Sequence, residues 1–397
     1  MFLALFLMAD PSHRVLLVGS DFRGIFTGPY MARQGAAQHL YDLHAQYYWQ
    51  SGLISEVSTY KALMPFLNPA FVVVCLLPLT FVPFAWAYVL WGMVNIVLFV
   101  FIFFWCFGLF REELQRAEGA QTPLFLLIFS WIPFWVAIMQ GQFSLVLVLS
   151  LCASWTACNK QQPFRAGVWL ALLFVRPHLV FVPAVLFLIT KQHKVLQGLL
   201  SGVVGLVGIG LLAGGVSGVL QYVKTLFFVG QVGDAFAIHP GFEPTVKSLL
   251  HALYRTNEVT TGILITWFAC FILLFLYIYW RQHKSAMRPH IVWALIPLVG
   301  ILASPHTNYH DLSLVFFSEL IVLKFLLSTR KDTKWVEKYV PFWGYVFVAV
   351  QMVVLWALLP LSAVTACILL VCTLYLLYFE YRHESARSSV MRKLHKQ

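Results

Sequence analysis

The sequence predicts an all-α membrane protein, a polytopic bundle of transmembrane helices in a single domain that covers residues 1–397. Two observations support this prediction. The chain is 60% apolar and only 11% charged, whereas a soluble domain has about 45–50% apolar and about 25% charged residues. The apolar residues also gather in about 11–13 runs of the length that helices in a bilayer require. Lipid is therefore the solvent that this composition needs.

Apolar runs follow one another along the whole chain. A helix needs roughly 20 residues to cross the hydrocarbon core, and most of the runs approach that length. The stretch before residue 20 is interrupted at Pro11, which predicts a broken first helix or additional sequence upstream. The later runs lie near residues 67–81, 84–110, 123–139, 143–158, 166–176, 178–190, 196–220, 259–280, 290–303, 312–328, 339–358 and 360–379.

Two of these runs, 166–176 and 178–190, are too short to span a membrane. They predict two half-helices that meet at Arg176-Pro177-His178. Broken helices are tolerated within a membrane where they line a cavity. The break is therefore a candidate for function.

Basic residues between the runs predict the orientation of the chain. Clusters at 111–116, 160–165, 191–194, 281–288, 330–338 and 382–396 hold 18 of the 27 Lys and Arg residues. The positive-inside rule places these clusters, and the basic tail 381–397, in the cytoplasm. The long polar loops 20–66 and 221–258 then lie on the extracytoplasmic side. This orientation requires an odd number of crossings between 66 and 111, which would make 67–81 a re-entrant or interfacial segment.

The first long loop mixes Tyr and Trp with polar residues between Gly28 and Trp49. Such a mixture suits one or two helices that lie in the membrane interface, where Tyr and Trp are favoured. An ordinary extramembrane loop is the alternative.

The formal net charge of +11 does not indicate nucleic-acid binding, because the Lys and Arg residues lie in short clusters between apolar runs. The seven cysteines have no CxxC spacing. We therefore expect neither a disulfide framework nor a zinc site.

Polar residues on the predicted extracytoplasmic side form four groups. Asp21 follows the first apolar stretch, and a polar residue at a helix end is the alternative interpretation. Gln140 and Gln142 flank Gly141, where a tight turn that needs glycine would explain the pattern equally well.

The third group is Arg176 with His178 at the predicted helix break. An arginine within the hydrocarbon costs about 2.5–3.5 kcal/mol on insertion scales and needs a partner. The two side chains are a candidate anion site. An internal ion pair with no further role is the alternative.

The fourth group lies between Ser304 and Asp311 and includes His306, Asn308 and His310. Metal ligation by His306, His310 and Asp311 is a minor alternative, because histidines spaced i and i+4 can share a helix face. Hydrogen bonding to a phosphate or a sugar is the stronger interpretation. We expect no metal and no other cofactor.

Several short motifs follow one another along the chain. They are Asp21-Phe22, Gly35 to Leu40-Tyr41-Asp42, Asn68-Pro69, Leu77-Pro78-Leu79 to Val82-Pro83, Gly141-Gln142, Arg176-Pro177 and Ser304-Pro305-His306 to Asp311-Leu312. In this order they resemble glycosyltransferase family 87 within the GT-C superfamily, over roughly residues 20–330. The sequence departs from the family pattern in three places: the first helix is short and interrupted, Asn68-Pro69-Ala70 stands where the family often has a double Pro, and Arg176 stands where Lys is common.

The resemblance implies a GT-C-like fold and an inverting transferase. The donor would be a sugar, often mannose or arabinose, on a polyprenyl phosphate, and the acceptor a lipid-linked glycan or a similar molecule outside the cytoplasm. Such an enzyme would lie in a bacterial inner or plasma membrane. The position that matches the family's general base is Asp21. Candidates to hold the donor phosphate are Arg176, His178, His306 and His310, and candidates to bind the sugar or the acceptor are Gln140, Gln142, Asn308, Asp311, Tyr41 and Asp42.

A multi-span transporter or lipid flippase is the main alternative function, because such proteins also have many spans and an arginine within the membrane. Transporters usually show internal repeats and several intramembrane charges. The sequence shows no such repeat. A membrane scaffold without catalysis is a further alternative, and it would not need these polar groups to converge in one pocket.

Overall fold

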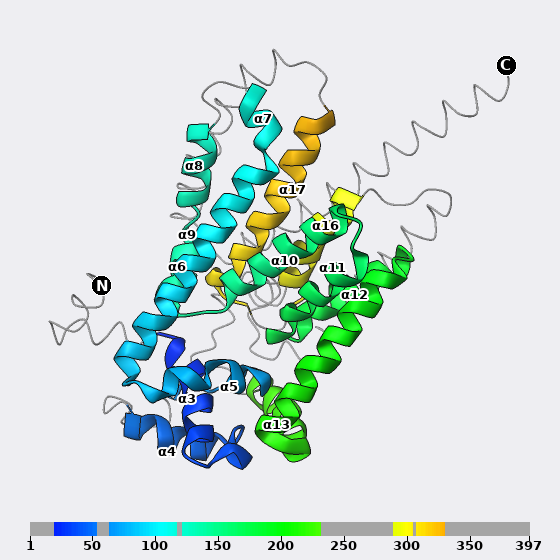
Figure 1. Cartoon of the computed structure of the whole chain (residues 1–397). Helices are drawn as coiled ribbons and strands as arrows, with labels where there is room; N and C mark the ends of the chain where they lie inside the picture. The colour runs from blue at the N-terminus through cyan, green and yellow to red at the C-terminus, as the bar shows by residue number, and fades with distance from the viewer. Residues whose placement is uncertain (1–19, 54–62, 117–120, 232–288, 305–306, 330–397) are drawn as a thin grey trace, which may run out of the picture. The chain divides into compact units, whose positions relative to one another are not determined.

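The computed structural model describes residues 20–53, 63–116, 121–231, 289–304 and 307–329 (Figure 1). Every regular element in these ranges is helical, and they contain no β-strand. The all-α prediction is therefore confirmed for this part of the chain. Within these ranges, two helices are long and apolar enough to cross a membrane, Phe84–Leu109 and His193–Leu226. A bundle with more spans than these stays a prediction.

The chain divides into two compact units that are interleaved in the sequence. The first contains Met1–Phe104, Pro133–Val180 and Lys194–His239, and the second contains Trp105–Ile132, Phe181–His193 and Pro240–Gln397. A single membrane domain over the whole chain stays a prediction. The predicted runs near 259–280, 339–358 and 360–379, the stretch before residue 20 and the basic tail lie outside the described residues.

The first unit begins with the predicted loop 20–66, which contains helices. They are α3 (Phe22–Arg33), the 3₁₀ turn η2 (Ala37–His39) and α4 (Leu43–Leu53). Helices were predicted here, and their location at a membrane interface stays a prediction.

Two buried glutamines of α4 hold the following segment against these helices. Gln46 accepts a hydrogen bond from the Phe66 N–H and donates one to the Leu40 carbonyl, both at 2.7 Å. Gln50 accepts from the Met64 N–H at 3.0 Å and donates to the Met64 carbonyl at 2.9 Å. Residues i and i+4 share a helix face, so the two amides act side by side.

The predicted run near 67–81 forms two short elements, α5 (Phe71–Leu76) and η4 (Leu77–Phe81). At about 1.5–2 Å per residue they reach about 20 Å at most, which is less than the roughly 30 Å of a hydrocarbon core. Their length favours the interpretation that this run does not cross. By contrast, the 26 residues of α6 (Phe84–Leu109) reach about 39 Å.

The run predicted near 123–139 is broken into α8 (Gln121–Phe129) and α9 (Ile132–Gln140). Pro133 explains the break. Proline has no N–H to continue the helical ladder, and its ring would clash with the carbonyl of the residue four positions earlier, which is Phe129 at the end of α8. The next helix, α10 (Ser144–Asn159), agrees with its predicted run.

The predicted pair of half-helices is confirmed. α11 (Pro163–Leu170) continues as η5 (Ala171–Val175), and α12 (His178–Ile189) starts after a break at Arg176-Pro177. Arg176 is extended, with φ −122° and ψ 91°. The clash of the proline ring with the preceding backbone imposes this conformation.

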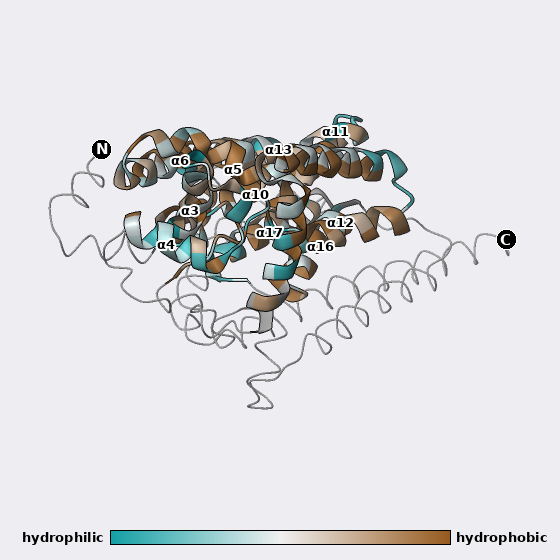
Figure 2. Cartoon of the chain, turned by 90° about the horizontal axis from the view of Figure 1, so that it is seen from below, coloured by the Kyte–Doolittle hydropathy of each residue, from teal (hydrophilic) through white to brown (hydrophobic). Residues whose placement is uncertain are grey.

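The longest helix is α13 (His193–Gln231), which is kinked at Gly215. It continues past residue 220 into the segment predicted as the second long loop, because its apolar composition extends to Leu226. It approaches α11 closely: a Cβ on Gly167 would lie 2.0 Å from the Val195 carbonyl oxygen. Small residues at such contacts are typical of helices in membranes. In Figure 2 most of α6 and α13 has hydrophobic colours.

The second unit contains the end of α6, α7 (Arg111–Arg116), α8, most of α12, α16 (Pro289–Leu302), η8 (Tyr309–Leu312) and α17 (Ser313–Thr329). The Ser318 hydroxyl of α17 donates a hydrogen bond to the Ala294 carbonyl of α16 at 2.7 Å. Lys324 binds both carboxylate oxygens of Glu113 at 2.8 Å and thereby joins α17 to α7.

Candidate functional site

Asp21 occupies the N-cap position of α3. Its backbone N–H donates a hydrogen bond to the Gln140 side-chain oxygen at 3.0 Å. The next residue, Phe22, is fully buried and packs against Phe84 and Tyr88 of α6. This packing fixes the start of the helix, whose partial positive charge favours a carboxylate there.

Gly141 forms the turn that brings Gln142 toward α3. The Gly141 N–H bonds to the Ile138 carbonyl and the Gln142 N–H to the Ala137 carbonyl, which is the Schellman pattern at a helix C-terminus. Gly141 has φ +65°, and a Cβ there would lie 2.7 Å from the Phe22 Cβ. Both the backbone conformation and the close approach therefore require glycine. The tight turn predicted at this motif is therefore confirmed.

Two aromatic side chains of α6 bind the same turn. The Trp91 indole N–H donates a hydrogen bond to the Gly141 carbonyl at 2.7 Å, and the Tyr88 hydroxyl donates to the Met139 carbonyl. Sequence reasoning missed both, because aromatic residues in an apolar run carry no local signal of a distant partner.

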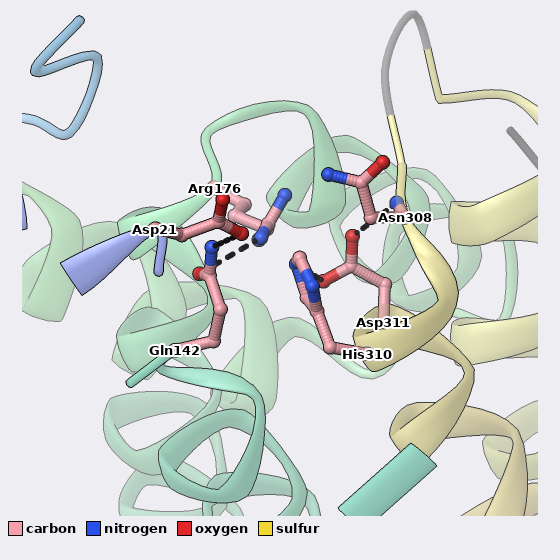
Figure 3. Close-up of polar contacts among 6 residues, drawn as sticks. All are labelled: Asp21, Gln142, Arg176, Asn308, His310 and Asp311. Carbon is pink, nitrogen blue, oxygen red and sulfur yellow. Dashed lines mark hydrogen bonds and ion pairs between the residues drawn. The ribbon is translucent and has the colours of Figure 1, made fainter. Parts of the chain in front are cut away.

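The side chain of Gln142 links Asp21 to Arg176, as Figure 3 shows. Its amide nitrogen donates to the Asp21 Oδ2 at 2.6 Å, and its amide oxygen accepts from the Arg176 Nη2 at 3.3 Å. This orientation of the amide is the only one that satisfies both neighbours, because a carboxylate only accepts and a guanidinium only donates. We call these three residues the Asp–Gln–Arg relay.

The relay joins three parts of the first unit. Asp21 comes from the start of α3, Gln142 from the turn after α9, and Arg176 from the break before α12. Gln142 is 9% exposed, and Asp21 and Arg176 are half-buried. The neutral amide of Gln142 thus bridges a carboxylate and a cation.

A second arginine lies next to the relay. Arg23 is 6% exposed, and burial lowers its pKa while the attraction of the Asp21 carboxylate acts in the opposite direction. The sequence analysis did not single out Arg23, although it lies two residues after Asp21.

Tyr41 and Asp42, predicted to bind the sugar or the acceptor, have structural partners in the first unit. The Tyr41 hydroxyl donates to the Asn68 carbonyl at 2.9 Å, and burial raises its pKa. The Asp42 Oδ1 accepts from the N–H groups of His44 at 2.9 Å and Ala45 at 3.3 Å. Asp42 therefore caps α4. A role of either residue in ligand binding stays a prediction.

His178 is the first residue of α12 and is half-buried. Arg176 lies just before this helix start, at the break. Its contact with a phosphate stays a prediction.

In the second unit, Asp311 is engaged by its own turn. Its Oδ2 accepts from the Asn308 N–H at 3.0 Å, and its Oδ1 lies 3.5 Å from the His310 Nε2 (Figure 3). Asp311 and His310 are 0% and 2% exposed. His306 lies outside the described residues, so the metal alternative is not tested.

The structure therefore brings together Asp21, Gln140, Gln142 and Arg176 in the first unit, and Asn308, His310 and Asp311 in the second. The gathering of both sets in one pocket stays a prediction.

The chain matches the model of glycosyltransferase family 87 over residues 66–305. Gln140, Gln142 and Arg176 lie within the matched segment, whereas Asp21 and His310 lie outside it. Comparisons with curated proteins and with solved structures gave no match. Because the match covers more than half of the 397 residues, the chain belongs to glycosyltransferase family 87, a family of membrane proteins that transfer sugars.

Proposed function

We propose that this glycosyltransferase moves a sugar from a polyprenyl-phosphate donor to a lipid-linked glycan or a similar acceptor, with inversion at the anomeric carbon. The reaction would take place on the extracytoplasmic side of a bacterial inner or plasma membrane. The observation that carries this proposal is the Asp–Gln–Arg relay, which holds a carboxylate and a guanidinium on opposite sides of one amide.

Inverting transfer needs one base and one stabiliser of the leaving group. The acceptor hydroxyl oxygen forms a bond to the anomeric carbon, and the bond from that carbon to the phosphate oxygen breaks. Asp21 takes the proton of the hydroxyl as general base. The electron pair leaves with the polyprenyl phosphate, which needs no strong general acid because it is already a fair leaving group.

Arg176 is the candidate to stabilise the departing phosphate. A guanidinium matches the geometry of phosphate oxygens and keeps its charge. His178 begins α12, a helix of 12 residues, and helix N-termini favour anions. Gln142 fixes the carboxylate and the guanidinium in place, so that neither has to reorganise during the reaction.

The test is transfer of radiolabelled sugar from polyprenyl-phosphate mannose by the purified full-length protein in lipid vesicles. Asp21→Asn keeps the shape of the side chain and removes the base. We expect it to lower kcat by about 10²- to 10⁴-fold with an unchanged melting temperature and unchanged donor binding.

Gln50→Met is the control. Gln50 is fully buried in the same unit, and its amide binds the backbone of Met64. We expect lower stability by about 1–3 kcal/mol and an unchanged kcat per folded molecule. Activity retained in Asp21→Asn would remove Asp21 from the base role. Movement of the donor across the vesicle without transfer would favour a transporter or flippase.

A further inference from the structure

The turn between α16 and α17 contains buried hydroxyl groups that no described residue binds. Thr307 is 1% exposed and Ser313 is 0% exposed. The Thr307 Oγ1 and the Ser313 Oγ have no hydrogen-bond partner within the described part of the chain. Buried polar groups are nearly always hydrogen-bonded, because leaving one without a partner costs stability. Two such groups in one turn therefore indicate partners other than the described residues, for which a bound ligand is the simplest candidate.

Asp311 lies between these two residues in the sequence, and its carboxylate already has partners within the turn. The Asp311 carboxylate accepts from the Asn308 N–H and contacts His310. These contacts order the turn. A role of Asp311 in sugar binding stays a prediction, and the hydroxyls of Thr307 and Ser313 are the groups of the turn that lack a partner among the described residues.

A third group of the same kind belongs to the second unit. Trp131 lies at the break between α8 and α9 and is 5% exposed, and its indole N–H has no partner among the described residues. Its ring packs against Phe316, with ring centroids 5.7 Å apart. Ser313 and Phe316 are spaced i and i+3 on α17, so they share a helix face. Trp131 therefore packs on the face and at the end of α17 where Ser313 lies.

We propose that Thr307 and Ser313, with the Trp131 indole N–H, bind hydroxyl groups of a sugar ring of the donor or of the acceptor. This inference rests on the proposed function. A Ser or Thr hydroxyl donates one hydrogen bond and accepts others, and an indole N–H only donates. Sugar hydroxyls offer both functions and carry no charge, so they can satisfy all three groups.

The test separates a role in binding from a role in stability. If the groups bind a ligand, their removal should weaken substrate binding and leave the melting temperature unchanged or higher. Thr307→Val and Ser313→Ala remove the hydroxyls with little change of shape. We expect each to leave the melting temperature unchanged or higher, since an unsatisfied buried group is lost. We also expect the KM for a sugar substrate to rise about 5- to 10-fold, as for the loss of one hydrogen bond, with kcat changed by about twofold or less.

Ser318→Ala is the matched control on the same helix. Ser318 is 2% exposed, and its hydroxyl is bonded to the Ala294 carbonyl. We expect a lower melting temperature and an unchanged KM. If Thr307→Val and Ser313→Ala behave like Ser318→Ala, the hydroxyls are structural and the inference is wrong.

The kinetic constants also show whether the bound sugar ring belongs to the donor or to the acceptor. A rise in KM for polyprenyl-phosphate mannose assigns the groups to the donor, and a rise in KM for the acceptor assigns them to the acceptor. Binding of polyprenyl-phosphate mannose, measured by thermal shift, distinguishes the two proposals. Wild-type protein that binds this probe without transferring sugar, and variants that bind it more weakly, would retain the site and overturn the transferase. Wild-type protein that neither binds nor transfers would overturn both.

Discussion

The Asp–Gln–Arg relay of the first unit and the turn before α17 in the second unit differ in how far their polar groups are hydrogen-bonded within the described residues. In the first unit, Gln142 is bonded on both sides, to Asp21 and to Arg176. In the second, the hydroxyls of Thr307 and Ser313 are buried without a partner in the described residues. A hydrogen-bonded network holds charged groups in place for chemistry. Buried polar groups without a partner lower stability, and a ligand that supplies the missing hydrogen bonds removes this cost. The comparison predicts that mutations in the first set lower turnover and mutations in the second alter affinity.

The largest effect that tests this difference, after loss of Asp21 itself, should come from Gln142→Met. The substitution removes the hydrogen bonds to Asp21 and to Arg176 and keeps the side chain's length. Bonds to charged groups contribute about 1.5–3 kcal/mol, so we expect kcat to fall about 10- to 100-fold with little change in KM. Steady-state transfer kinetics would measure it.

Gln46→Met is the control for that variant. Gln46 is fully buried in the same unit, and its amide binds backbone groups of Leu40 and Phe66. It should lower the melting temperature without changing kcat per folded molecule. A rise in KM at constant kcat in Gln142→Met would contradict the comparison, because the relay would then act in binding.

An intermediate effect is expected from Gly141→Ala. A non-glycine residue at positive φ costs about 1–2 kcal/mol, and the new Cβ would lie 2.7 Å from the Phe22 Cβ. We expect the melting temperature to fall by about 5 °C or more and kcat to fall because Gln142 is displaced. Differential scanning fluorimetry and the transfer assay would measure both.

Gly35→Ala isolates the contribution of the close contact. Gly35 also has a positive φ, of 81°, but nothing lies within 4 Å of the position of its Cβ. It should show only the cost of the backbone conformation, with normal activity. Equal losses in the two variants would mean that the approach of the turn to Phe22 is unimportant.

The smallest effect should come from Asn95→Leu, which examines a buried polar group of the first unit outside the relay. Asn95 is fully buried in α6, and its side-chain oxygen has no partner in the described part of the chain. Its amide nitrogen donates to the Trp91 carbonyl of the same helix. We expect the melting temperature to rise by up to about 3 °C at unchanged kcat and KM. A raised KM would give Asn95 the behaviour expected of Thr307 and would contradict the comparison between the relay and the turn before α17.

Much of the local structure could be predicted because it depends on local rules. Pro177 predicts the break between η5 and α12, since a residue before proline avoids the helical conformation. Gly141 predicts a turn, since glycine adopts a positive φ without steric cost. The prediction of one continuous helix near 123–139 was wrong, because it followed the apolar composition and did not take Pro133 into account. The predicted end of the helix at residue 220 was wrong, because one or two polar residues do not end an apolar helix.

The candidate site could be predicted only in part. Asp21, Gln142 and Arg176 were selected as polar residues among apolar ones, and the structure brings these three together. Asp311 was selected by the same criterion, yet its carboxylate is bound by its own turn. Thr307 and Ser313 were passed over, because hydroxyl residues are common at helix ends and their partners cannot be read from sequence.

The sequence by itself determined the membrane character, the all-α composition and the positions of the helix breaks, because hydropathy and proline act on neighbouring residues. Only the tertiary structure decided which polar groups are partnered. Gln142 is separated from Asp21 by 121 residues and from Arg176 by 34, and a hydrogen bond depends on distance and direction in space. Whether a polar side chain supports the fold or is left to bind a ligand is therefore set by packing between distant segments.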